Sequence, residues 1–204
     1  MAEPTSRVTP RLRRSDRRAQ LLSAARRAFV AQGYHSAAMD DIADRAGVSK
    51  PVLYQHFPSK LELYLALLSE SADELVRLVR AALHETRDND ERVHRAVEAY
   101  FTFVANNDQA YRLIFESDLR GQPMVEEIVD RATDSCIAAI TDTITTDTGV
   151  DLERSRLLAA ALVGLSQVSA RYWLTQGAGV PRAEAIEMLS TLAWRGISRF
   201  PRQP

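Results

Sequence analysis

Residues 42–54 read IADRAGVSKPVLY, and this stretch decides the fold. Its apolar residues recur at helical spacing up to Gly47, which can adopt the left-handed conformation of a tight turn. Ser49 can cap a second helix, and Pro51 suits the first turn of that helix, where a backbone N–H has no partner. Two short helices joined by such a turn predict a helix-turn-helix, a motif that binds double-stranded DNA.

The second helix, residues 50–57, has two unlike faces. At about 100° per residue, Leu53 and Phe57 lie close together and face the core. The opposite face can meet bases, because apolar side chains contact thymine methyls and glutamine pairs with adenine, while Lys and Tyr suit phosphates. Lys60 opens the following helix, where it either contacts a phosphate or is simply solvated. The expected DNA-binding residues are Ser49, Lys50, Pro51, Val52, Tyr54, Gln55, His56 and Lys60.

Charge is divided unevenly along the chain, although the net charge is only −1. Residues 1–60 hold 11 Lys and Arg against 5 Asp and Glu, whereas residues 61–204 hold 15 against 22. Both lysines of the chain lie in the basic segment. This asymmetry indicates a polyanionic partner at the basic end, without by itself distinguishing DNA from RNA or a membrane.

The remaining chain predicts an all-α fold. Helical periodicity continues to the end, with no convincing strand alternation. The expected domains are a flexible basic arm over 1–14, a three-helix DNA-binding domain over 15–60, and a larger helical ligand-binding and dimerisation domain over 61–204. The predicted helices cover residues 15–33, 39–46, 50–57, 60–84, 91–106, 109–118, 124–146, 152–175 and 182–200. Ser15 is the expected N-cap of the first of these helices.

Several other classes of protein are disfavoured. The chain lacks a P-loop, G-x-G-x-x-G, H-E-x-x-H and G-x-S-x-G, so we expect no enzyme, no metal site and no cofactor. The lone Cys136 excludes a disulfide framework and fits a cytoplasmic protein. No signal-peptide core is present, and the longest uncharged apolar run, between Arg156 and Arg171, is too short to span a bilayer.

These residues resemble the TetR-type regulators, a family named after the tetracycline repressor. The matching pattern runs as Phe29-x3-Gly33-Tyr34, then Met39-x2-Ile42-Ala43-x2-Ala46-Gly47-Val48-Ser49-x3-Leu53-Tyr54-x-His56-Phe57-x2-Lys60. The resemblance implies that residues 50–52 approach bases while Tyr54, His56 and Lys60 approach phosphates. The chain departs from the family at Ala37-Ala38, where Ser or Thr is usual. A backbone N–H or Ser36 would have to replace that hydroxyl contact.

The segment beyond residue 60 is similar to one branch of this family, the acyl-CoA-sensing regulators of fatty-acid synthesis. The similar stretches include residues 60–66, 111–116, 135–137, 162–165 and 170–174. The resemblance implies a hydrophobic tunnel for a long acyl chain, with the coenzyme portion nearer solvent. Ordinary core packing is the alternative for each lining residue. The candidate ligand-binding residues are Leu75, Val79, Leu83, Tyr100, Val104, Phe115 and Leu165.

The expected function is therefore a sequence-specific, effector-controlled transcription regulator. Two subunits would pair through helices 152–175 and 182–200 in a four-helix bundle, and ligand binding would change the spacing of their recognition helices. Long-chain acyl-CoA is the expected effector. The alternatives are a TetR-type repressor that senses another hydrophobic small molecule, or a nonspecific architectural DNA binder.

Overall fold

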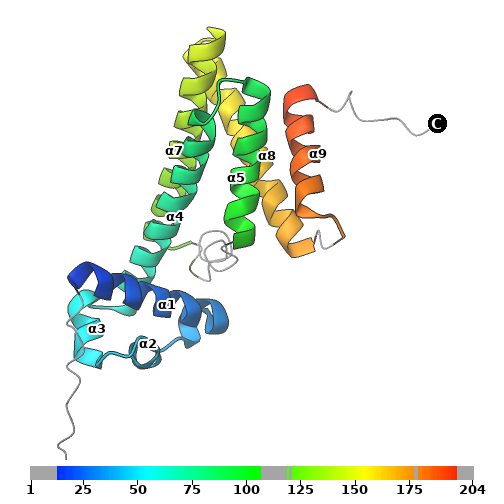
Figure 1. Ribbon diagram of the computed structural model, residues 1–204. Helices are drawn as coiled ribbons and strands as arrows, with labels where there is room; N and C mark the ends of the chain where they lie inside the picture. The colour runs from blue at the N-terminus through cyan, green and yellow to red at the C-terminus, as the bar shows by residue number, and fades with distance from the viewer. Residues whose placement is uncertain (1–12, 107–118, 120, 177–178, 197–204) are drawn as a thin grey trace, which may run out of the picture. The chain divides into compact units, whose positions relative to one another are not determined.

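Helices account for all the regular structure in the ranges described by the computed structural model, which are residues 13–106, 119, 121–176 and 179–196 (Figure 1). This confirms the all-α prediction. The predicted helix over 109–118, the candidate Phe115 and most of the basic arm lie outside the described residues. The helices are α1 (Arg14–Ser36), α2 (Met39–Arg45), α3 (Lys50–His56), α4 (Lys60–His84), α5 (Asn89–Asn106), α7 (Pro123–Thr148), α8 (Leu152–Gln176) and α9 (Arg182–Arg195).

The chain forms two compact units, one up to Leu67 and the other from Leu68 onward. The boundary falls inside α4, so this one helix belongs to both units. In the N-terminal unit, α2 packs against both α1 and α3. Fully buried Leu21, Ile42 and Leu53 supply one core residue from each of these three helices.

The turn of the motif has the conformation that its sequence predicts. Gly47 has a φ of 63°, in the left-handed region, and Pro51 occupies the first turn of α3. Two capping predictions are wrong. Ser15 lies within α1, which begins at Arg14, and the Ser49 side chain makes no capping hydrogen bond although Ser49 occupies the N-cap position of α3.

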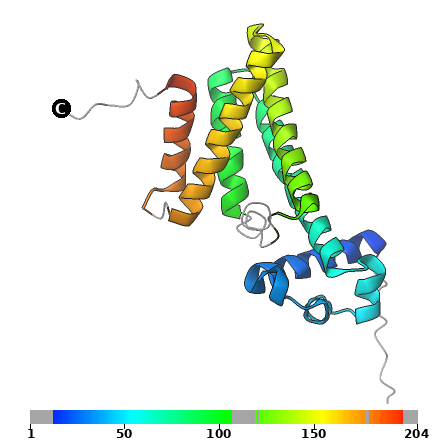
Figure 2. The ribbon, with the colours of Figure 1, turned by 180° about the vertical axis from the view of Figure 1, so that it is seen from behind.

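The C-terminal unit is built from α5, α7, α8 and α9 together with the later turns of α4. α8 runs diagonally across this unit and packs against α7, α5 and α9 (Figure 2). Gly149 and Gly196, which directly follow the last residues of α7 and α9, both have positive φ. The end of α9 at Arg195 corrects the prediction that this helix runs to residue 200, because Gly196 turns the backbone out of the helix first.

α8 carries several large apolar side chains that are exposed in this structure. Leu157, Val168 and Tyr172 are 73%, 59% and 64% exposed. By length and composition α8 is long and apolar enough to cross a membrane. Its uncharged stretch between Arg156 and Arg171 would span only about 21 Å of a hydrocarbon core about 30 Å thick. An exposed apolar helix face of this kind also suits a protein partner.

Candidate functional site

The recognition helix α3 presents two faces, as its sequence predicts. Leu53 and Phe57 are buried at 0% and 3% exposure, which confirms their inward orientation. The opposite side carries most of the candidate DNA-binding residues. Of these, Ser49, Lys50, Pro51, Tyr54 and Gln55 are exposed, and Val52 and His56 are half-buried.

Helix α1 supports this motif from behind. The Gln20 side-chain amide donates a 2.7 Å hydrogen bond to the Ala46 carbonyl, at the end of α2. The Arg18 guanidinium lies 4.9 Å from the centre of the Phe57 ring, at the end of α3. One contact therefore holds α2 to α1 and the other holds α3 to α1, and together they fix the orientation of α3 within this unit.

Lys50 forms an exposed ion pair across the motif. Its Nζ lies 2.9 Å from a carboxylate oxygen of Asp40 on α2. The hydrogen bond to Asp40 and the charge of its carboxylate raise the pKa of Lys50. Such a solvated pair is weak, so the ammonium remains available to exchange Asp40 for a group on DNA.

His56 lies in a basic environment. Burial lowers the pKa of its imidazole, and the positive charges of Arg14, Arg17 and Arg18 on α1 lower it further. The imidazole is therefore mostly neutral in the free protein at neutral pH. The same arginines form a positively charged region beside α3, which suits the phosphate backbone.

This environment predicts a pH-dependent affinity for DNA. A phosphate beside His56 would favour the imidazolium and raise its pKa, so binding would take up a proton. Affinity should then rise as the pH falls from about 8 towards 6. The full rise is about tenfold for each pH unit by which DNA binding raises the pKa of His56. Fluorescence anisotropy measures this rise. It should vanish in His56→Gln and persist in His35→Gln, and a rise that survives in His56→Gln would contradict the prediction.

Lys60 differs from the other candidates in its surroundings. Its Nζ lies within 3.1 Å of the backbone carbonyl oxygens of Tyr34, His35 and Ala37 at the end of α1.

Ala37 and Ala38 stand where Ser or Thr is usual in the family that the sequence resembles. Ala37 is buried, and Ala38 precedes α2 without a side-chain cap. No hydroxyl is therefore available at positions 37 and 38 for a phosphate.

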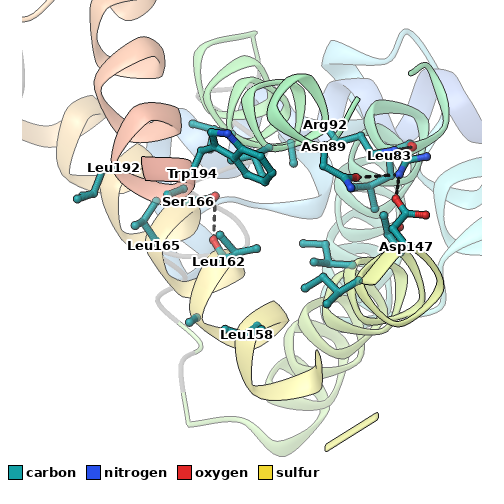
Figure 3. Close-up of a pocket in the computed structure, with 18 of the residues that line it drawn as sticks. Leu83, Asn89, Arg92, Asp147, Leu158, Leu162, Leu165, Ser166, Leu192 and Trp194 are labelled. Atoms are coloured by element: carbon teal, nitrogen blue, oxygen red, sulfur yellow. Dashed lines mark hydrogen bonds and ion pairs between the residues drawn. The ribbon is translucent and has the colours of Figure 1, made fainter. Parts of the chain in front are cut away.

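A cavity of about 650 Å³ lies in the C-terminal unit between α5, α7, α8 and α9 (Figure 3). Such a volume is typical of small-molecule sites. Its wall is mainly aliphatic and aromatic. The lining residues are Leu83, Asn89, Arg92, Val93, Ala96, Val97, Tyr100, Ile140, Thr143, Ile144, Asp147, Thr148, Leu158, Ala161, Leu162, Leu165, Ser166, Leu192, Ala193 and Trp194.

Among the described residues that line this cavity, the charged groups are confined to one pair, Arg92 with Asp147. Figure 3 shows the two side chains meeting at one side of the cavity. Arg92 Nε also donates to the carbonyls of Leu83 and Thr86, and Arg92 Nη1 donates to Asn89 Oδ1. The guanidinium thus ties the end of α4 and the start of α5 to α7.

The predicted ligand-binding residues divide into two groups. Leu83, Tyr100 and Leu165 line the cavity. Leu75, Val79 and Val104 are also buried but do not line it, so in this structure they serve as core. Burial raises the pKa of Tyr100 well above its ordinary value and also raises the pKa of the neighbouring Cys136 thiol. Both groups therefore stay uncharged beside an apolar cavity.

Sequence reasoning missed the contribution of α7 and the Arg92–Asp147 pair. Ile140 and Ile144 are four residues apart, and this helical spacing could have identified the apolar face of α7. No comparable signal marks the ion pair, because its partners are 55 residues apart in the chain.

Comparison with known families finds two matching models. Residues 21–67 match the model described as bacterial regulatory proteins, tetR family. Residues 89–196 match the tetracyclin repressor-like C-terminal domain. These matches cover the helix-turn-helix and the helices that enclose the cavity.

Individual proteins of known sequence or structure are also similar to this chain over most of its length. The HTH-type transcriptional activator FasR of Mycolicibacterium smegmatis is 51% identical over 94% of this chain and 87% of its own length. A TetR-like regulator from Rhodococcus sp. RHA1 is 29% identical, with a TM-score of 0.73 over 93% of this chain and all of that one. FadR of Bacillus subtilis, solved in complex with stearoyl-CoA, has a TM-score of 0.70 at 19% identity and covers 88% of this chain and 98% of its own.

Proposed function

Because the chain belongs to the TetR family of bacterial regulatory proteins, it is a helix-turn-helix transcription regulator rather than an enzyme, and we propose that a long-chain acyl-CoA controls its binding to operator DNA. The observation that carries this proposal is the mainly apolar cavity of the C-terminal unit. An acyl chain requires an uncharged environment, and the charged pair found among the described wall residues is mutually neutralised. The coenzyme portion is polyanionic and would remain nearer solvent.

Two relatives support the choice of effector and its effect. FadR of Bacillus subtilis shares the fold and holds stearoyl-CoA in its structure. FasR of Mycolicibacterium smegmatis, a much nearer relative in sequence, is a transcriptional activator, which favours activation by this chain. A regulator of this kind acts on the chromosome, so we place it in the cytoplasm.

The proposed DNA interface is the outer side of α3. Pro51, Val52 and Gln55 would contact base edges, while Tyr54 and His56 at the border would contact phosphates. Exposed and half-buried side chains on this face are free to make such contacts. Ser49 and Lys50 extend the surface at the start of the helix.

A selection of bound genomic fragments, with and without acyl-CoA, tests the whole proposal. We expect a palindromic operator near lipid genes, whose recovery changes with stearoyl-CoA and not with free CoA. An effect of free CoA alone would contradict the acyl-chain assignment. A response to another apolar compound and to no acyl-CoA would favour a different hydrophobic effector, and fragments without sequence preference would favour an architectural DNA binder.

We further propose that the chain acts as a homodimer through α8 and α9. Leu157, Val168 and Tyr172 recur at helical spacing on one face of α8, and Gly164 on the same face has open space where a Cβ would lie. Met188, which is also exposed, adds an apolar side chain on α9. A two-fold pairing of these helices would bury this surface and present two α3 helices to a palindromic operator.

Val168→Arg should therefore dissociate the dimer. An arginine at the centre of an apolar interface would lose its hydration without gaining a partner, which is strongly unfavourable. Light scattering at micromolar concentration should give the mass of a monomer, and operator binding should fall by about a hundredfold or more. Ala138→Arg, which adds the same charge on the exposed side of α7, should remain dimeric. A dimeric Val168→Arg protein would contradict this interface.

A further inference from the structure

The corner between α4 and α5 is closed by the side chain of Arg92, which lies in the first turn of α5. Its Nε donates to the carbonyl of Leu83, in the last turn of α4, at 3.1 Å and to that of Thr86, in the corner, at 2.9 Å. Carbonyls at the C-terminal end of a helix have no intrahelical partner, and a cation there also suits the helix dipole. Arg92 therefore fixes the end of α4 to the start of α5.

The corner has further hydrogen bonds of its own. Asp88 Oδ1 accepts from the backbone N–H groups of Asp90 and Glu91, at 2.9 Å and 3.2 Å, and so caps the start of α5. Arg92 Nη1 donates to Asn89 Oδ1 at 2.9 Å. The corner and the end of α4 thus form one hydrogen-bonded network.

Asp147 links this network to α7. It lies at the C-terminal end of that helix, and its carboxylate accepts from Arg92 Nη1 (Figure 3). The two side chains are 15% and 27% exposed, so solvent weakens this pair less than it weakens the exposed pair of Lys50 and Asp40. The contact therefore holds the end of α7 to the end of α4.

This contact is also part of the cavity. Arg92 and Asp147 both lie on the cavity wall, and so does Leu83. The carbonyl of Leu83 accepts from Arg92, so a single residue belongs both to the cavity and to the network at the corner. On α7, Ile144 and Thr148 line the cavity within one turn of Asp147. A molecule in the cavity consequently meets groups on both sides of the Arg92–Asp147 contact.

We propose that the Arg92–Asp147 contact couples the cavity to α4, with both residues acting as positioning residues for the end of this helix. The inference rests on the proposed control by acyl-CoA, because it concerns how that control reaches α4. An acyl chain that displaces the end of α7 displaces Asp147, and Arg92 carries the displacement to the last carbonyls of α4. That helix belongs to both compact units, so it also includes part of the DNA-binding unit.

Asp147→Asn tests this contact and keeps the size of the side chain. Asparagine lacks the negative charge, so its hydrogen bond to Arg92 is weaker and the end of α4 is held less firmly to α7. Asp142→Asn is the matched control, because it removes the same charge from an exposed position of α7 that does not line the cavity. Asp147→Glu, which retains a carboxylate, is the conservative variant.

The first measurement needs no effector. Hydrogen exchange of the backbone amides of residues 83–88, followed by mass spectrometry, reports how often the end of α4 opens. We expect about fivefold faster exchange in Asp147→Asn, and rates close to those of the unsubstituted protein in Asp142→Asn and Asp147→Glu. Unchanged exchange in Asp147→Asn would overturn the proposal.

The second measurement is the coupling itself. Operator affinity is determined by anisotropy without stearoyl-CoA and at a concentration that saturates the shift in melting temperature of the same protein. A changed affinity for stearoyl-CoA then does not affect the comparison. Stearoyl-CoA should change operator affinity by about tenfold in the unsubstituted, Asp142→Asn and Asp147→Glu proteins, but by about twofold or less in Asp147→Asn. A merely structural role would leave this ratio intact, so a full response in Asp147→Asn also overturns the proposal.

Failure of the proposed function would give a different result. If stearoyl-CoA neither shifts the melting temperature of the unsubstituted protein nor alters its binding to operator, acyl-CoA is not the effector. Hydrogen exchange then decides the role of the Arg92–Asp147 contact alone, since it requires no ligand.

Discussion

Gln55→Ala is expected to weaken binding to the operator by about 30-fold or more while leaving binding to random duplex nearly unchanged. Gln55 is exposed on the outer side of α3, one turn after the exposed Pro51. A bidentate contact between glutamine and adenine contributes about 1–3 kcal/mol, and a dimer would lose it at both half-sites. Because the side chain is neutral, its loss releases no extra counterions and should not alter the salt dependence.

Anisotropy titrations with the selected operator and with a random duplex of equal length measure this difference. Gln32→Ala, at an exposed position of α1 in the same unit, is the matched control and should bind like the unsubstituted protein. An operator in which the contacted adenine is replaced should be bound equally by the Gln55→Ala and unsubstituted proteins. An equal loss on operator and random duplex would show that Gln55 contributes no base recognition.

Ile144→Trp is expected to abolish the response to acyl-CoA. Ile144 lines the cavity from α7, and an indole there would occupy space that an acyl chain needs. The unsubstituted protein should be stabilised by about 2.7 kcal/mol at a stearoyl-CoA concentration of 100 times Kd, which corresponds to about 5–10 °C. The variant should show no such rise, although its affinity for operator without effector should be retained.

Thr146→Trp provides the matched control, since this exposed residue lies two positions further along α7 and does not line the cavity. It should keep the full shift in melting temperature. Free CoA should produce no shift in any of the three proteins. A normal response in Ile144→Trp would mean that the acyl chain binds outside this cavity.

The helix-turn-helix could be predicted closely because its determinants are local. Gly47, Pro51 and the pair Leu53 and Phe57 each act through the conformation or periodicity of their own short segment, and the structure has all of them as expected. Capping by Ser15 and Ser49 was less predictable. A hydroxyl cap forms only if the helix starts directly after that residue and the side chain adopts the right rotamer. The start of a helix can shift by a residue, so the sequence does not determine either condition.

The ligand site could be predicted only in outline. Leu75 and Leu83 lie on the same broad apolar face of α4, yet Leu83 lines the cavity while Leu75 is packed elsewhere. Periodicity marks a buried face but does not distinguish the wall of a cavity from solid core. The sequence also does not predict the hydrogen bonds of Arg92 and Lys60, because their partners are distant in the chain and meet only in the folded protein.

The continuity of α4 across the boundary between the two units has a consequence for exchanging parts between regulators. A flexible linker would tolerate a junction of any length, but here the junction lies within a single helix of 25 residues. Each residue inserted or deleted there would turn everything beyond it by about 100° and shift it by about 1.5 Å. A chimera with a foreign sensor would therefore transmit its signal only when the two sequences are joined in the same helical phase.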